Sequence, residues 1–181
     1  MTTAVAAATW NIDASHSIAE FAVKHMMVST VKGRFGTLEG VADLDESNPL
    51  ASSVRASIDV ASITTNEPQR DAHLRSDDFF NAEKFPAITF ASKRVERVDA
   101  ENYRVVGDLT IRDVTKEVVL DTEFEGQVLD PYGNQRAGFT ATTQINRSHF
   151  GVSFNGLLET GGVIVSDKVK ITLHIEAVRA A

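Results

Sequence analysis

Alternation of apolar and polar residues runs through most of this chain and predicts β-strands. In residues 101–112, apolar side chains occupy nearly every odd position, from Tyr103 to Ile111, and polar ones nearly every even position. A two-residue period places one face of a strand against a core and the other in solvent. The same period recurs in 19–24, 34–44, 54–60, 88–90, 118–125, 139–145 and 169–176. The pattern therefore predicts about eight strands, mostly long.

Two local features refine this prediction. The apolar phase changes between Phe35 and Leu38, with Gly36 between them, which favours a β-bulge at the glycine. The prolines all fall outside the alternating runs, as the hydrogen-bond ladder of a sheet requires, at positions 49, 68, 86 and 131.

One segment departs from the strand pattern and predicts a short helix around 66–80. It begins with cap residues and an early proline, TNEP, and continues as QRDAHLRSDDFF. We expect Arg70 and Asp71 to tie this helix to a strand end. His73 and Asp77 lie four residues apart and would share a helix face, but two ligands do not make a metal site. We predict no metal.

Long antiparallel strands in one domain have edges to protect, and closure into a barrel removes them. We therefore expect an all-β fold, an eight-stranded antiparallel barrel, which is just wide enough to be filled by side chains or to hold one small ligand. The inward faces include small residues, Ala56, Gly107, Ala141 and Thr143. These either leave a cavity or offset neighbouring phenylalanines, and the alternation does not decide between the two.

Composition narrows the class of protein further. The chain has 181 residues, 43% of them hydrophobic and 24% charged, as expected of one ordinary globular domain. We expect a flexible N-terminus over 1–8 and a single domain over 9–178. The absence of cysteine excludes disulfides and thiolate chemistry, and a formal charge of −7 argues against a nucleic-acid partner. We read neither a membrane span nor a signal peptide, and a cytoplasmic location is the expectation.

Candidate catalytic residues are few. Asp13, Ser15 and His16 suggest a triad, but neighbouring strand residues point to opposite faces and no G-x-S-x-G elbow is present. We interpret Asp13 and Ser15 as turn formers and predict no catalytic residue. His25 shares the parity of Phe21, so it points inward, either as a core histidine or as a ligand contact. The segment 146–151, NRSHFG, is either a barrel rim contacting a ligand head group or a solvated turn.

Five segments together resemble the YceI-like family, the lipocalin-like polyisoprenoid-binding proteins of bacteria. They are TWNIDASHSIAEFAVKHM (9–26), VKGRFGTLEG (31–40), SITTNEPQRDAHLRSDDFFNAEKFPAITFAS (62–92), VVGDLTIRDVTKEVVL (105–120) and INRSHFGV (145–152). The resemblance implies an extended eight-stranded lipocalin-like barrel around a hydrophobic tunnel that binds elongated amphiphiles. It also implies a possible homodimer. One departure is Asp113, where the family usually has glycine. If that position has a positive φ, aspartate is a tolerable replacement.

Carried onto this chain, the resemblance implies a ligand-binding set. His16 and His25 become candidates for a polar end of the pocket. The candidate tunnel lining is Phe21, Phe35, Phe79, Phe85, Ile88, Phe90, Leu109, Ile111, Phe139, Ala141 and Ile145. The resulting hypothesis is a carrier or store for a polyisoprenoid, an isoprenoid quinone or a fatty-acid-like lipid, with no other cofactor. The alternatives are a solid-core interaction module and an enzyme acting on a lipid.

Overall fold

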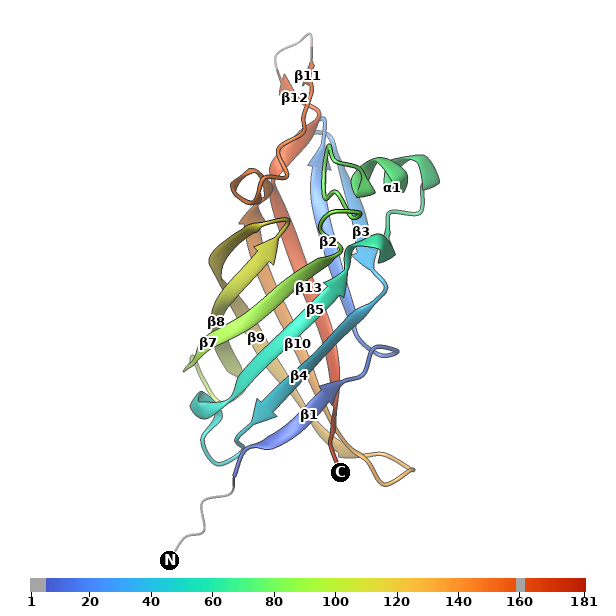
Figure 1. The fold of residues 1–181 in the computed structure, drawn as a ribbon. Helices are drawn as coiled ribbons and strands as arrows, with labels where there is room; N and C mark the ends of the chain where they lie inside the picture. The colour runs from blue at the N-terminus through green and yellow to red at the C-terminus, as the bar shows by residue number, and fades with distance from the viewer. Residues whose placement is uncertain (1–5, 159–161) are drawn as a thin grey trace, which may run out of the picture.

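The protein folds as a closed antiparallel barrel of eight strands, seen in a computed structural model that describes residues 6–158 and 162–181 (Figure 1). The ring follows the order β1-β4-β5-β7-β8-β9-β10-β13, and β1 pairs with β13 to close it. These strands are β1 (Ala8–Ile12), β4 (Leu38–Leu44), β5 (Ser53–Asp59), β7 (Ala87–Arg97), β8 (Asn102–Ile111), β9 (Val114–Leu129), β10 (Gln135–Asn146) and β13 (Val165–Arg179). The predicted fold class is confirmed. Of the N-terminus expected to be flexible, residues 1–5 lie outside the described residues.

One edge of the long strand β13 pairs with β10, and the other edge has two partners in succession. This happens because the chain between Ile12 and Ile18 leaves the sheet. The C-terminal end of β13 pairs with β1, and its N-terminal part pairs with β2 (Ile18–His25). Strand β2 continues the sheet to β3 (Ser29–Phe35) and β6 (Ile63–Thr64). The predicted strand 19–24 therefore lies beside the ring, and the ring strand β1 was missed because its five residues are too short to show a period.

The phase change at Gly36 marks a break between two strands, so the predicted bulge is wrong. Strand β3 ends at Phe35, the chain bends, and β4 begins at Leu38 with different partners. Irregularities of register occur elsewhere, between Gly138 and Phe139, in the β7–β8 pairing and in the β13–β2 pairing. The four prolines lie outside the strands, as predicted.

The helix α1 (Pro68–Arg75) is shorter than the predicted 66–80. The Glu67 carboxylate caps it by accepting the N–H groups of Gln69 and Arg70. The buried Asp71 accepts the backbone N–H of Thr65 at 2.7 Å, and Arg70 donates to the Thr65 carbonyl at 2.9 Å. These bonds fasten α1 to the end of β6, which confirms the anchoring role predicted for Arg70 and Asp71.

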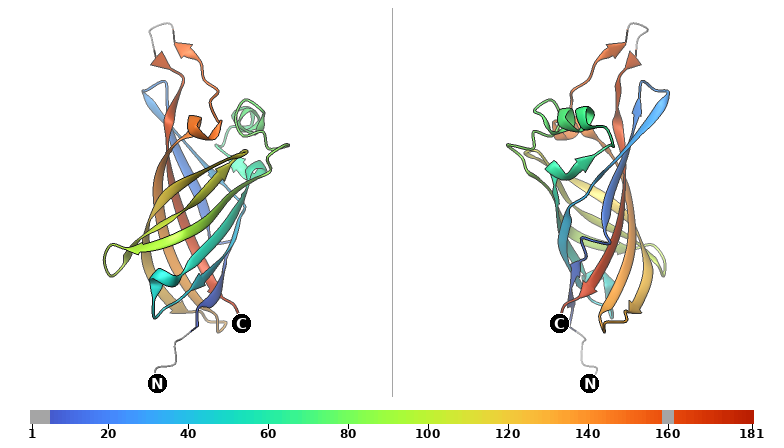
Figure 2. Two further views of the ribbon diagram at one scale, coloured as in Figure 1. Left: turned by 60° about the vertical axis from the view of Figure 1, so that its left-hand side comes forward. Right: turned by 90° about the vertical axis from the view of Figure 1, so that its right-hand side faces the viewer.

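The two ends of the barrel differ in what they carry (Figure 2). The α1 end carries the helix, the 3₁₀ helices η2 (Val60–Ser62) and η3 (Arg147–Phe150), and the hairpin of β11 (Leu157–Leu158) and β12 (Gly162–Val163). The other end, which we call the termini end, carries the start of β1, the last residues of the chain and η1 (Pro49–Ala51). Among the described residues, no helix is long and apolar enough to cross a bilayer.

Candidate ligand cavity

A cavity of about 690 Å³ occupies the inside of the barrel, and all eight ring strands contribute to its lining. The volume lies within the roughly 300–1,000 Å³ of ordinary ligand pockets. The surface that lines it is mostly apolar. Ten residues of the predicted ligand-binding set border it, Phe21, Phe35, Phe79, Ile88, Phe90, Leu109, Ile111, Phe139, Ala141 and Ile145. Contact of these ten with a ligand stays a prediction.

Small residues on the inner face have both of the roles that the alternation left open. The Phe90 ring lies against Gly107, where a Cβ atom would come within 2.6 Å of its Cζ, and the Phe21 ring lies against Gly33 in the same way. These glycines accommodate phenylalanines. Ala56, Ala141 and Thr143, by contrast, border the open cavity. The barrel is therefore hollow where its inner face carries alanine and threonine.

Aromatic side chains close the cavity at the α1 end. Phe80 lies edge-on to Phe35, with ring centroids 5.9 Å apart, and both rings border the cavity. Phe79, His73 and Phe154 pack against one another, with ring centroids 5.0 to 5.3 Å apart. This end of the cavity is consequently apolar and well packed.

The buried Arg147 borders the cavity at the α1 end, and its role there is structural. Its guanidinium donates to four backbone carbonyls, those of Val152, Phe154, Val165 and Ser166, at 2.8 to 3.2 Å. Burial lowers the pKa of this guanidinium, since desolvation disfavours the charged form. Segment 146–151 was interpreted as either a rim that contacts a ligand head group or a solvated turn. Neither describes Arg147, which is buried beside the cavity but donates its hydrogen bonds to the protein's own carbonyls.

Polar residues border the cavity at the termini end. Asp45, Glu46 and Ser47 come from the β4–β5 connection, and Arg97 and Tyr103 from the β7–β8 hairpin. The hydroxyl and N–H of Ser47 donate to Asp45, and together with the Asn48 N–H they lower the pKa of this carboxyl. The sequence reasoning missed this set. Its ESNP turn signal was visible, but a turn signal does not reveal that the turn lies beside the cavity.

Trp10 supplies a buried donor near this polar end. Its indole is fully buried against Ala42, Ala137 and Ala177. Strand β1 pairs Trp10 with Ala42, which borders the cavity, whereas Trp10 itself lies behind the lining. Within the described part of the chain, its Nε1–H has no acceptor. A buried donor without a partner is uncommon in folded proteins, so this N–H is a candidate for contact with a ligand or a water.

The three remaining residues of the predicted ligand-binding set lie outside the cavity lining. His16 lies on the outer surface, in the β1–β2 connection, with its side chain 61% exposed. His25 is half-buried at the end of β2, and it is absent from the residues that border the cavity. Phe85 packs under the Arg112 guanidinium, 5.4 Å from it. The polar end of the cavity is formed by other residues than the two histidines.

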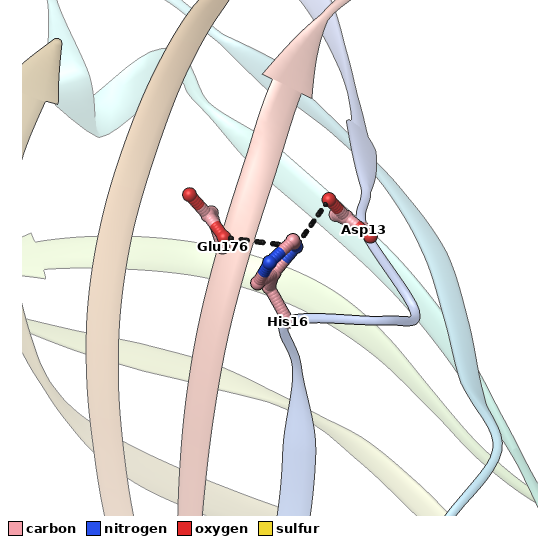
Figure 3. Close-up of side chains that lie close together, drawn as sticks. All are labelled: Asp13, His16 and Glu176. Atoms are coloured by element: carbon pink, nitrogen blue, oxygen red, sulfur yellow. Dashed lines mark hydrogen bonds and ion pairs between the residues drawn. The ribbon is translucent and has the colours of Figure 1, made fainter. Parts of the chain in front are cut away.

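The outer cluster around His16 is an ion-pair network (Figure 3). His16 Nδ1 lies 2.9 Å from Asp13 and 3.5 Å from Glu176, and Arg136 reaches the same two carboxylates at 2.8 and 3.7 Å. Hydrogen bonds from Ser15, His16 and Arg136 hold the pKa of Asp13 well below its usual range. The hydrogen bond to Asp13 raises the pKa of His16, and Glu176 adds to this effect.

This cluster contains Asp13, His16 and Ser15 together, which the strand geometry did not predict. Ser15 Oγ lies 3.1 Å from His16 because both residues belong to a turn, and Asp13 and Ser15 form that turn as predicted. A catalytic triad uses the two ring nitrogens for serine and aspartate separately, whereas here Nδ1 faces both. Asp13, His16 and Glu176 could also surround a metal ion, but Arg136 already supplies a positive charge to the two carboxylates.

Two further sequence predictions are changed by the structure. His73 bonds Asp78 at 2.8 Å rather than facing Asp77, because α1 ends at Arg75. Asp77 instead accepts from Arg112. The condition raised for Asp113, a positive φ, is not met: the positive φ of this turn, 55°, is at Arg112, so the aspartate occupies a position that does not need glycine.

A closed antiparallel barrel around an apolar cavity is a lipocalin-like architecture. The chain matches the YceI-like domain over residues 10–177, and it therefore belongs to the YceI-like family. It is 40% identical over 176 residues to a UPF0312 protein of Yersinia enterocolitica, covering 96% of this chain and 88% of that protein. The crystal structure of the Campylobacter jejuni YCEI protein superposes with a TM-score of 0.76 at 34% identity, covering 87% of this chain and 90% of that one. A polyisoprenoid binding domain from Saccharophagus degradans shares the fold, with a TM-score of 0.73 at 15% identity, covering 96% and 99% of the two chains.

Proposed function

We propose that this protein binds one long-chain amphiphilic lipid along the barrel axis and carries or stores it without covalent chemistry. The observation that carries this proposal is the 690 Å³ cavity with its apolar lining. Burial of a hydrocarbon chain contributes roughly 0.8 kcal/mol per CH₂ group, so affinity needs no charged partner. The polyisoprenoid-binding domain with the same fold supports an isoprenoid as the ligand class.

The polar residues at the termini end favour an uncharged head group there. Asp45 and Glu46 bring two carboxylates to this end, against the single guanidinium of Arg97. A phosphate or carboxylate head would therefore meet like charge. Among the described residues the Trp10 N–H lacks an acceptor, and a shift of the indole toward the adjoining cavity would let a carbonyl or hydroxyl oxygen of the ligand satisfy it. An isoprenoid quinone or a long-chain alcohol has this combination of features.

Fluorescence of Trp10, the sole tryptophan of the chain, tests the proposal directly. Delipidated protein would be titrated with a long-chain isoprenoid quinone, the matching prenol and the matching prenyl phosphate. We expect saturable quenching by the quinone at one ligand per chain, comparable competition by the prenol and weaker competition by the phosphate. If no long-chain lipid binds, the proposed function is wrong. If the phosphate binds best, the assignment of the head group is wrong.

The carrier role has its own measurement. Native mass spectrometry of protein purified from its own cells, followed by organic extraction, should release an unmodified lipid. Recovery of a chemically altered lipid after incubation with the purified protein would favour an enzyme instead.

A further inference from the structure

The turn between β2 and β3 exposes three apolar side chains in succession at the α1 end. Met26, Met27 and Val28, which we call the apolar tip, are 41%, 64% and 82% exposed. The tip is tied to the base of the β11–β12 hairpin by the Met26 N–H, which donates to the Ile164 carbonyl at 2.8 Å. Both features project from the same end of the barrel in each view of Figure 2.

The backbone of the apolar tip is unfavourable for the residues that occupy it. Met26 and Met27 have positive φ values of 49° and 62°, and the Val28 N–H closes the turn on the His25 carbonyl. Turns with two positive φ values favour Asn-Gly, and bulky residues are outliers in this region. Two long thioether side chains are thus held in solvent at a free-energy cost, and such strain points to a role for the side chains themselves.

Four lysines lie behind the apolar tip, on the outer face of the same sheet. Lys24, Lys32, Lys168 and Lys170 are exposed and alternate along their strands with residues such as Val23 and Val169 that border the cavity. The strand register places Lys170 beside Ala22 and Ala22 beside Lys32, in one row across three strands.

These lysines are available to a ligand. Within residues 6–158 and 162–181, none of the four forms an ion pair with an acidic side chain. The nearby acids are engaged, since Glu20 lies 3.5 Å from His174, and Asp167 accepts from Ser148. In a chain of net charge −7, these four lysines are a local concentration of positive charge.

The termini end provides a comparison, because it also exposes apolar residues. Val128 and Leu129 in β9 are each 61% exposed. Their charged neighbours are acidic on balance, however. Glu125 lies on the same strand, and Arg136, which is opposite Val128, is already paired with Asp130 at 2.7 Å and with Asp13 at 2.8 Å. The cation beside Val128 is therefore occupied, whereas the lysines near the apolar tip are not, so charge distinguishes the two ends.

We propose that the apolar tip docks this protein on an anionic lipid bilayer. The side chains of Met26, Met27 and Val28 enter the boundary between head groups and acyl chains, while the four lysines contact lipid phosphates. A short apolar anchor combined with a basic patch gives reversible, salt-sensitive membrane binding. This inference goes beyond the proposed function, because docking on a bilayer requires neither an opening into the cavity nor a lipid bound inside it.

Vesicle flotation tests the docking with the intact chain. At low salt we expect the protein to float with vesicles of phosphatidylglycerol and phosphatidylcholine, and to remain behind with phosphatidylcholine alone or at high salt. The double variant Met26→Asn/Met27→Gly gives the turn its preferred residues, so its melting temperature should equal or exceed that of the wild type. Its vesicle binding should nevertheless fall by at least about tenfold. Lys24→Gln and Lys168→Gln should each weaken binding about fivefold.

Leu129→Asn is the matched control, because it removes an equally exposed apolar residue at the acidic end, and its vesicle binding should equal that of the wild type. Absence of wild-type flotation at low salt would overturn the proposal, as would wild-type binding by the Met26→Asn/Met27→Gly variant. A concentration-dependent dimer that this variant abolishes would assign the tip to a second copy instead. Lipid titration of Trp10 fluorescence should be unchanged in the variant, so failure of docking and failure of lipid binding are distinguishable.

Discussion

Two glycines that accommodate aromatic rings differ in what an added methyl group would strike. At Gly107 a Cβ atom would lie 2.5 Å from the backbone oxygen of Ala91, whereas at Gly33 the three atoms nearest to it would all belong to the Phe21 ring. The backbone oxygen of Ala91 cannot move away without disturbing the sheet, but the Phe21 ring can rotate into the adjoining cavity. We therefore expect Gly107→Ala to destabilise the fold by about 1–3 kcal/mol.

Gly33→Ala should cost clearly less stability and instead weaken lipid binding, because Phe21 then occupies part of the cavity. Urea unfolding of the two variants, together with Trp10 fluorescence titrations, checks both effects. Equal destabilisation by the two changes, with binding intact in each, would show that the region around Phe21 is solid.

The raised pKa of His16 predicts a pH dependence of stability. The hydrogen bond from His16 to Asp13 stabilises the charged imidazole in the folded state. Its contribution to stability is full below the ordinary histidine pKa of about 6.5 and is lost as the pH rises through the raised pKa of the folded state.

Urea midpoints measured from about pH 5.5 to about pH 8.5 should therefore fall for the wild type. The decline should be smaller in His16→Ala, which lacks the titrating group. His174→Ala is the control, because its 3.5 Å pairing with Glu20 lies outside the Asp13 cluster, and it should retain the decline. The same decline in His16→Ala as in the wild type would contradict this assignment.

At the scale of elements, Arg147 joins the segment 152–154 to the start of β13. Its guanidinium satisfies four carbonyls that have come together from both segments. Hydrogen bonds to charged groups contribute roughly 1.5–3 kcal/mol each, so Arg147→Met should destabilise the protein by several kcal/mol. Hydrogen exchange should locate the loss at residues 151–156 and 165–166. Wild-type protection of these residues in the variant would mean that the hydrogen bonds of Arg147 are dispensable.

The long strands were predictable from sequence because one of their faces is dry over many residues, and β8 shows this directly. The elements that escaped prediction are those fixed by distant partners. Strand β1 has five residues and is defined by its pairing with β4 and β13. The break at Gly36 is set by the exchange of partners between β3 and β4, and a local phase change cannot distinguish it from a bulge.

The candidate site likewise contains residues that the sequence could predict and residues that it could not. Residues on the inner face, such as Phe90 and Ala141, follow from strand parity, and the structure places them on the cavity. His16 shows the limit of that reasoning, because it lies in a turn, where parity does not apply. The polar residues Asp45 and Arg97 meet only because a closed barrel brings separate connections to one end.

At the scale of the whole molecule, a hollow barrel responds to an added side chain differently from a solid one. Ala141 on β10 borders the cavity and is 5% exposed, between Thr122 and Leu173 on the adjacent strands. In a solid core, Ala141→Trp would cost about 1–3 kcal/mol through overpacking. In the hollow barrel, the indole would replace ligand contacts, so the ligand-free variant should be at least as stable as the ligand-free wild type.

Thermal melting of delipidated proteins with and without a long-chain isoprenoid quinone makes the comparison. Ligand at about 100 times Kd stabilises the native state by about 2.7 kcal/mol, which raises the melting temperature of a domain this size by roughly 5–10 °C. This rise should occur in the wild type and disappear in Ala141→Trp. Thr142→Trp adds the same indole to the outer face of the same strand and should keep the rise. A strongly destabilised Ala141→Trp, together with a wild type that no long-chain lipid stabilises, would mean that the barrel is filled in solution and that lipid carriage is not its function.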